Sequence, residues 1–279
     1  MNLNYNFVDC SWGKVHTVSS NSEKEEVFLL LHGWMDNWSS FLPLMENLDI
    51  NFIGIDFPGH GLSDHLPDGN WYHFIDYVVR LEEIIRELKL KTFHIIGHSM
   101  GAAVGTVYAG TYPKNVNSLT LIDGLGPLVN EPEQAPDILK EAISSKVGKK
   151  MINRHYKDKK LAVKARLSSG KMEYKSAEIL VNNQMKLNDQ GEWQWTFDPK
   201  LKLTSSLRMT PKQMQAFLKR ITCPVLLINA LNGFISKSPY WEYRKLIREL
   251  TEIELNGNHH IHMDSPKEVA KSILKFLNL

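Results

Sequence analysis

Short apolar runs recur along the chain and predict strands buried on both faces of a sheet. The runs are rich in β-branched, aromatic and leucine residues, and each is four or five residues long. They are Val27–Leu31, Asn51–Ile55, Thr92–Ile96, Ser118–Ile122, Val225–Ile228 and Thr251–Leu255. The first twenty residues alternate in character around Trp12-Gly13 instead. That alternation predicts an antiparallel pair of strands added at the edge of the sheet.

Helical periodicity fills most of the intervals between these runs. Tyr72–Leu88 carries one broad apolar face, and residues 100–111 are rich in Ala and Gly, which favours close packing on a sheet. Ser265 is expected as the N-cap of a last helix over Pro266–Leu277. Strands that are each followed by a helix predict a doubly wound α/β sheet. Ligands of such sheets bind beyond the carboxyl ends of the strands.

The alternation breaks between about residues 125 and 215. Ala135–Lys150 and Ser176–Leu187 show helical patterns there, and no strand is predicted before Pro224. We therefore expect a core formed by residues 1–124 and 216–279. Residues 125–215 are expected to form a helical cap or lid inserted after strand 6, and are called the insertion below.

Composition and charge place the chain among ordinary globular proteins. Its 279 residues are 43% apolar and 23% charged, which argues against a disordered chain or a coiled coil. The net charge of +2 gives no overall signature of nucleic-acid binding. Residues 131–220, however, hold 19 Lys and Arg against 10 Asp and Glu. They are either a solvated lysine-rich face or a cationic surface that attracts anionic substrates or lipid head groups.

The cysteines and the N-terminus bear on localisation. Only Cys10 and Cys223 are present, too few for a disulfide framework, which fits a reducing compartment. The first residues lack the features of a signal peptide, and no apolar run approaches the ~18–20 residues that span a bilayer. We expect an intracellular, cytoplasmic protein with no transmembrane segment; organellar targeting and oligomeric state stay open.

The strongest chemical motif is GHSMG at 97–101, between an apolar run and the small-residue helix. In this strand–turn–helix context, G-x-S-x-G is the pattern of a nucleophile elbow, with Ser99 exposed above the sheet. The alternative is a glycine-rich turn that contains an incidental serine. A serine nucleophile needs a base, and His259, His260 and His262 follow the last predicted strand. We expect His259 to be the base and the other two to be packing or loop residues.

Two further features of the site follow from this interpretation. The backbone N–H groups of Trp34, after His32-Gly33, and of Met100, after the nucleophile, are expected to form an oxyanion hole. The histidine cluster also suggests a metal site, but no Cys or carboxylate motif with ligand spacing accompanies it. We therefore expect no metal and no cofactor.

Four segments together resemble the α/β-hydrolase superfamily. They are HGWMDN at 32–37, DFPGHGLS at 56–63, GHSMG at 97–101 and GNHHIHMDSP at 257–266. Within it, the wording of the first and last is similar to the kraken-type serine hydrolase-like proteins. The resemblance implies an eight-stranded, mostly parallel sheet with helices on both faces and a helical lid. It also implies Ser99 as nucleophile and His259 as base.

The acid departs from the superfamily's common pattern. Many members carry it in the loop after the seventh strand, but residues 222–241 contain no carboxylate. Asp123 ends the sixth strand, beside the nucleophile's strand, and completes the superfamily's order Ser, Asp, His. Asp123 is therefore the expected acid. The alternatives are that Asp123 only caps a turn with Gly124, or that Asp56 is the acid.

These residues predict a serine hydrolase that cleaves a carboxylic ester or thioester through an acyl-enzyme. The expected substrate is a small acyl compound, and anionic acyl compounds are among the candidates. No nucleic-acid partner is expected. A carbon–carbon bond hydrolase would use the same triad. A non-catalytic ligand-binding protein on a hydrolase fold is the alternative of another class.

Overall fold

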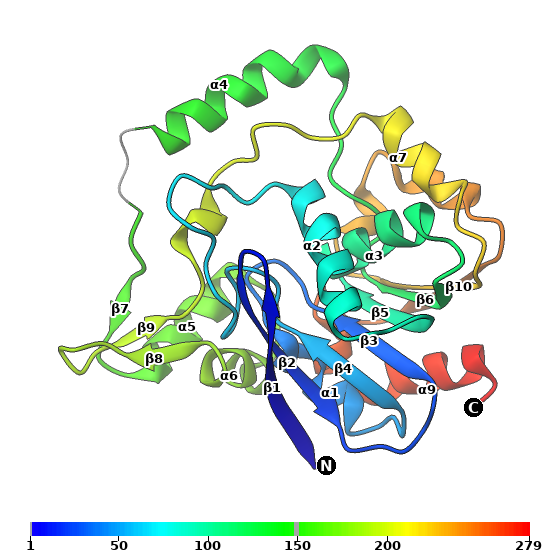
Figure 1. Ribbon diagram of the computed structural model, residues 1–279, viewed down its shortest axis with the longest axis horizontal. Coiled ribbons are helices and arrows are strands. Elements are labelled where there is room, and N and C mark those ends of the chain that lie inside the picture. The colour runs from blue at the N-terminus through cyan, green and yellow to red at the C-terminus, as the bar shows by residue number, and fades with distance from the viewer. Residues whose placement is uncertain (1, 148–150) are drawn as a thin grey trace.

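One eight-stranded sheet organises the molecule (Figure 1). The computed structural model describes residues 2–147 and 151–279. The strand order is β1-β2-β4-β3-β5-β6-β10-β11, with β1–β2 and β2–β4 antiparallel and the other pairs parallel. The strands are β1 Leu3–Cys10, β2 Gly13–Ser20, β3 Val27–Leu31, β4 Asn51–Ile55, β5 Phe93–His98, β6 Val116–Ile122, β10 Val225–Ala230 and β11 Leu250–Leu255. The predicted strands, the antiparallel edge pair and the fold class are confirmed.

Helices cover both faces of this sheet. They are α1 Leu42–Met45, α2 Phe74–Glu87, α3 Met100–Thr111, α7 Pro211–Leu218, α8 Ile261–Asp264 and α9 Pro266–Leu277. Short 3-10 turns also occur at η1 Trp38–Phe41, η2 Pro132–Gln134, η3 Pro199–Lys202, η4 Ile235–Lys237 and η5 Trp241–Leu246. Ser265 does stand at the N-cap position of α9, but its side chain makes no capping hydrogen bond.

Side-chain alternation along the strands divides the core into two apolar layers. In β3, Leu29 and Leu31 pack in one layer with side chains of α2 and α3. Phe28 and Leu30 point to the other face and pack with side chains of α1 and α9. Because successive side chains of a strand point to opposite faces, a fully apolar run is required where both faces are covered. This is why the sequence shows unbroken apolar runs at these strands.

The insertion differs from its prediction in one respect. It contains α4 Ala135–Lys146, α5 Lys159–Ser169 and α6 Tyr174–Asn182, but also a three-stranded sheet ordered β7-β9-β8. Its strands are β7 His155–Tyr156, β8 Met185–Leu187 and β9 Trp193–Trp195. The expectation of no strand here, and of a helix continuing to Leu187, is therefore wrong. Residues 148–150 of the helix expected over Ala135–Lys150 lie outside the described residues.

A tight turn explains the strand at Met185–Leu187. The Asn188 side-chain oxygen accepts hydrogen bonds from the backbone N–H groups of Gln190 and Glu192, and Gly191 adopts a φ of 75°. Asn and Gly favour such a turn, which joins β8 to β9 as a hairpin. Pairing with β9 thus replaces the helical continuation that the local pattern predicts.

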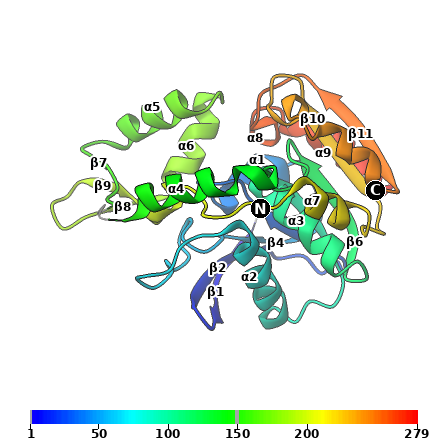
Figure 2. The ribbon, with the colours of Figure 1, turned by 90° about the horizontal axis from the view of Figure 1, so that it is seen from above.

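The insertion lies to one side of the core, and α4 stands at the edge of the molecule (Figure 1, Figure 2). The chain segments that enter and leave it are joined by a bridge between Val129 and Met209. α7 starts at Pro211, within the expected insertion, yet packs on α3 of the core. None of the helices in residues 2–147 and 151–279 is long and apolar enough to cross a bilayer.

Candidate active site

Ser99 stands at the turn between β5 and α3 with a strained backbone. Its φ of 52° and ψ of −113° lie in a region that non-glycine residues rarely adopt. Its backbone N–H donates to the carbonyl of Ile122 at the end of β6, 3.1 Å away. Ser99 is partly exposed, and α3 begins at the next residue, so the positive end of the helix dipole points toward it. This is the geometry of a nucleophile elbow.

The two glycines of the motif are required by close backbone contacts. A Cβ on Gly97 would lie 2.7 Å from backbone atoms of Ala102, and one on Gly101 would overlap the carbonyl oxygen of Leu31. Since Cβ atoms do not approach so closely, only glycine allows the turn to pack against β3. The start of α3 is thereby brought next to the residues that follow β3.

His259 connects to Ser99 and to Asp123 through its two ring nitrogens. It lies in the loop between β11 and α8. Its Nε2 is 2.9 Å from Ser99 Oγ, and its Nδ1 is 2.5 Å from Asp123 Oδ2. The three residues, 160 positions apart at most, therefore form one continuous chain of hydrogen bonds. His260 and His262 are buried, and among the described residues neither hydrogen-bonds to the serine hydroxyl.

Asp123 is buried at the carboxyl end of β6, between β5 and β10. Its φ of 41° is left-handed, a conformation that aspartate tolerates better than most residues. Its backbone N–H donates to the carbonyl of Ile228, and its Oδ1 accepts the N–H of Ala230 at 3.4 Å. These bonds fix the carboxylate toward His259. Capping of a turn with Gly124 does not by itself require the bonds that Asp123 makes to β10 and to His259.

Gly233 explains why this carboxylate fits. A Cβ at position 233 would lie 2.5 Å from Asp123 Oδ2, in the space that the carboxylate now fills. A side chain at position 233 and the Asp123 side chain therefore exclude each other. Asp56 is held elsewhere: it pairs with His16 at 2.8 Å and accepts the backbone N–H of Trp38.

The expected oxyanion donors meet at the same end of the sheet. Met100 is the first residue of α3, so its N–H has no acceptor within the helix. Trp34 follows Gly33 after β3, and its side chain is half exposed. The contact of Gly101 with Leu31 brings these two segments together. The oxyanion hole formed by these two N–H groups stays a prediction, which this arrangement of the two segments supports.

A buried polar cluster that sequence reasoning missed lies behind His259. His98 Nε2 donates to the carbonyl oxygen of His259 at 2.9 Å, and the two rings lie 4.6 Å apart. His260 Nε2 is 3.2 Å from Oδ2 of Asp36, and Arg166 of α5 pairs with Oδ1 of the same carboxylate. The sequence signals for this cluster are the HGWMDN, GHSMG and GNHHIHMDSP motifs, which contain Asp36, His98 and His260.

Burial and charge act in opposite directions on this cluster. Burial alone would raise the pKa of the Asp36 carboxyl, but the Arg166 guanidinium and then His260 outweigh it and hold that pKa well below its usual value. Burial, followed by the neighbouring His262, lowers the pKa of His98 well below the ordinary value of a histidine. Asp36 is therefore an anion at neutral pH and His98 a neutral ring.

Known proteins resemble the chain along most of its length. A family model described as alpha/beta hydrolase fold matches residues 26–266. A "Serine hydrolase-like protein" of Danio rerio is 30% identical over 281 residues, covering 95% of this chain and 86% of that protein. A "Probable serine hydrolase" of Drosophila melanogaster is 29% identical over 282 residues, which cover 95% of this chain and 85% of that protein.

Solved structures share the fold. The hypothetical protein PA1622 from Pseudomonas aeruginosa PAO1 superposes with a TM-score of 0.92 at 29% identity, over 99% of each chain. The thioesterase domain from the curacin biosynthetic pathway superposes with a TM-score of 0.86 at 21% identity, over 98% of this chain and all of that one. At the latter identity the likeness concerns the fold alone. The chain belongs to the α/β-hydrolase family, and curated relatives that match nearly its whole length are named as serine hydrolase-like or probable serine hydrolases.

Proposed function

We propose that the protein hydrolyses a carboxylic ester or thioester through an acyl-enzyme formed on Ser99. The observation that carries this proposal is the chain of hydrogen bonds from Asp123 through His259 to Ser99, with distances of 2.5 and 2.9 Å. Nucleophile, base and orienting acid in this arrangement constitute the geometry of a catalytic triad.

The proposed reaction follows from the roles of these groups. His259 Nε2 accepts the hydroxyl proton as Ser99 Oγ attacks the acyl carbon. The oxyanion that forms accepts hydrogen bonds from the backbone N–H groups of Trp34 and Met100. Collapse of this intermediate expels the alcohol or thiol, which takes the proton from His259. Water, deprotonated by the same ring, then hydrolyses the acyl-enzyme.

Asp123 has a purely electrostatic and orienting role in this proposal. Its carboxylate accepts a hydrogen bond from Nδ1–H of His259, which leaves Nε2 unprotonated and free to act as the base. It also stabilises the imidazolium that forms during attack. The carboxylate is fully buried, so water does not screen this interaction.

We further propose that the insertion, residues 125–215, covers the entrance and selects the acyl group. It contacts the loops that carry the chemistry: Arg166 reaches Asp36 after β3, and Ser176 bonds to Asp264 in α8 at 2.6 Å. The basic residues of this segment would attract an anionic substrate.

The test is hydrolysis of p-nitrophenyl esters of increasing acyl length and of acyl-CoA thioesters. Ser99→Ala should lower kcat/KM by ~10³-fold or more, since triad members act as a unit. Ser168→Ala is the matched control, because this exposed hydroxyl in α5 bonds, among the described residues, only to the carbonyl of Lys164. More than half of the wild-type activity in Ser99→Ala would refute the nucleophile. A folded wild type that cleaves none of these compounds would refute ester and thioester hydrolysis.

A further inference from the structure

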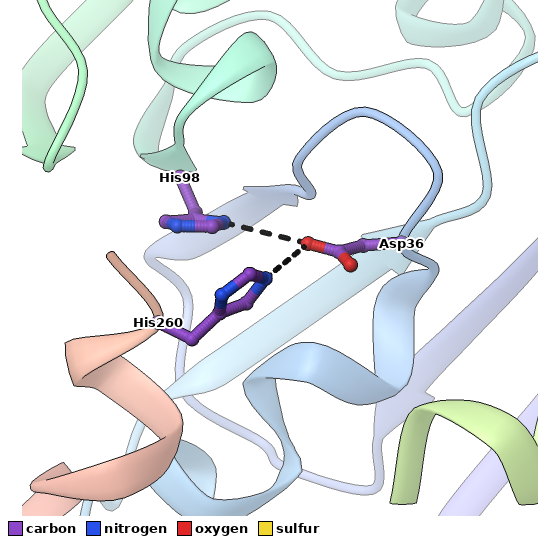
Figure 3. A group of neighbouring side chains, drawn as sticks. All are labelled: Asp36, His98 and His260. Atoms are coloured by element: carbon purple, nitrogen blue, oxygen red, sulfur yellow. Dashed lines mark hydrogen bonds and ion pairs between the residues drawn. The ribbon is translucent and has the colours of Figure 1, made fainter. Parts of the chain in front are cut away.

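Asp36, His98 and His260 converge from three distant parts of the chain (Figure 3). Asp36 follows β3, His98 ends β5, and His260 precedes α8. One carboxylate oxygen and two ring nitrogens lie within 4.8 Å of one another, and all three side chains are buried. Two imidazole nitrogens and one carboxylate oxygen form a donor set that suits zinc and similar divalent ions.

The hydrogen bonding of His98 leaves one nitrogen available to a cation. Its Nε2 lies 2.9 Å from the carbonyl oxygen of His259, which only accepts, so Nε2 carries the proton. Nδ1 then presents a lone pair, and it has no hydrogen-bond partner among residues 2–147 and 151–279. It faces Oδ2 of Asp36 at 3.7 Å. A lone pair and a carboxylate oxygen repel each other unless a cation lies between them.

His260 completes the group from the other side. Its Nε2 donates to the same oxygen of Asp36 at 3.2 Å, so ligation of an ion by Nε2 moves this proton to Nδ1, which has no hydrogen-bond partner in the described part of the chain. Figure 3 shows both rings directed toward this carboxylate. A histidine ligand whose other nitrogen donates to a backbone carbonyl, as in His98, is a common arrangement around protein-bound metals.

Arg166 now supplies positive charge next to this group. Its Nη2 pairs with Oδ1 of Asp36 and is 3.4 Å from Nε2 of His260. Arg166 belongs to α5 of the insertion, and its side chain is 16% exposed. Withdrawal toward solvent would therefore open a route to the three buried ligand atoms.

We propose that Asp36 Oδ2, His98 Nδ1 and His260 Nε2 form a binding site for a divalent transition-metal ion such as Zn²⁺ or Co²⁺. The guanidinium of Arg166 competes with the ion for the negative charge of Asp36. Binding of the ion and the Arg166 contact oppose each other, so the ion weakens one link between the insertion and the core. The site adjoins His259 through His98 and lies outside the proposed triad.

The sequence does not predict this site, because no Cys or carboxylate motif lies at ligand spacing from the histidine cluster. Asp36 is 224 residues away from His260 along the chain. No local spacing pattern could associate the two. The fold supplies the missing carboxylate.

The test is equilibrium binding of Zn²⁺ by calorimetry and of Co²⁺ by its visible absorption. Arg166→Gln should bind either ion at least about tenfold more tightly than the wild type, because a competing like charge is removed. Arg154→Gln is the control, since this arginine lies over the Tyr156 ring in the same insertion. Its affinity should equal that of the wild type.

Replacing a side chain that ligates the ion should abolish metal binding, and with it the gain in affinity from Arg166→Gln. Asp36→Asn combined with Arg166→Gln eliminates both charges of the pair together, so neither is left without its partner. This double variant, and His260→Asn in the wild-type background, should lose binding while circular dichroism shows an intact fold. Unchanged affinity in Arg166→Gln, or equal affinity in the ligand variants, would overturn the site. The readout is independent of hydrolysis, so it fails or succeeds separately from the proposed function.

Discussion

The sheet core and the insertion are held in place by different kinds of interaction. All six residues of β5 and all six of β10 are buried, and the layers around them are continuous. In contrast, α4 buries only Ala142, and α5 buries only Ala162 and Val163. Packing in a close-packed core fixes positions to fractions of an ångström, whereas a sparsely buried helix gains little from burial.

Polar contacts supplement this limited packing where the insertion meets the core. Arg166 pairs with Asp36, and Ser176 bonds to Asp264. Gln184 donates its amide to the backbone carbonyl of Asp36 at 3.2 Å. The strands of the core are thus buried throughout, whereas the outer helices α4 and α5 of the insertion are sparsely buried, and the insertion is joined to the core by α6, which is more deeply buried, and by these polar bonds. Changes in the core should therefore affect turnover, and changes in the insertion should affect access.

The largest effect predicted for the core, beyond loss of the nucleophile, concerns Asp123. Asp123→Asn keeps the shape of the side chain but removes the charge that stabilises the imidazolium of His259. We expect kcat to fall by up to ~10⁴-fold with little change in KM. Steady-state kinetics on the best ester substrate measures this. If Asp123→Asn has nearly wild-type activity and Asp56→Asn is inactive, the acid is not Asp123.

Relocating the carboxylate sharpens the same prediction. Because a side chain at position 233 would fill the space of the Asp123 carboxylate, Asp123→Gly with Gly233→Asp transfers the acid to the loop after β10. We expect the double variant to exceed Asp123→Gly in kcat by about tenfold or more. Equal rates in the two variants would mean that position 233 cannot serve His259.

The core should also show a pH-dependent stability that originates in its buried histidines. Burial, and then His32, lowers the pKa of His60 to about 3, and burial, and then His260, lowers that of His262 well below its usual value. The unfolded chain therefore binds more protons than the folded one below about pH 6.5. Stability from these groups is complete above that pH and falls as pH decreases, by about 1 kcal/mol per pH unit for each group.

Urea unfolding at pH 7.5, 6.5 and 5.5 measures this slope. His262→Leu removes one such group, and neither nitrogen of His262 has a hydrogen-bond partner within the described part of the chain. We expect the variant to lose less stability on acidification than the wild type. Parallel slopes for the two proteins would show that His262 is protonated in the folded state.

The smallest effect is expected in the insertion and concerns charge. Lys160, Lys164 and Lys175 are exposed, and none has an acidic partner within 4.0 Å in residues 2–147 and 151–279. If they lie near the entrance, kcat/KM for an anionic acyl-CoA should fall several-fold as ionic strength rises from ~20 to ~300 mM. A neutral ester of similar length should change little. Equal responses would indicate that these lysines form only a solvated face.

The difference between the sheet core and the insertion also separates what could be predicted from the sequence from what could not. Strands such as Val27–Leu31 are predictable because burial on both faces requires an unbroken apolar run. The elbow at Ser99 is predictable because the glycines that the turn requires, Gly97 and Gly101, lie within one motif of five residues. Both features are local and belong to the core.

Features that depend on contacts between distant residues could not be predicted. The strand Met185–Leu187 exists because of its pairing with β9, and its own composition does not exclude a helix. The pairing of Asp36 with Arg166 joins residues 130 positions apart. A single sequence contains no periodicity that associates such partners.

The most direct test of the central claim is labelling by a fluorophosphonate probe, followed by mass spectrometry of the intact protein and of its peptides. We expect one adduct per chain, located on Ser99. His259→Ala should slow labelling by ~10³-fold or more, since the base activates the hydroxyl. His260→Ala should retain labelling. A folded wild-type protein that does not react, or an adduct on another residue, would contradict the assignment of Ser99 as the nucleophile.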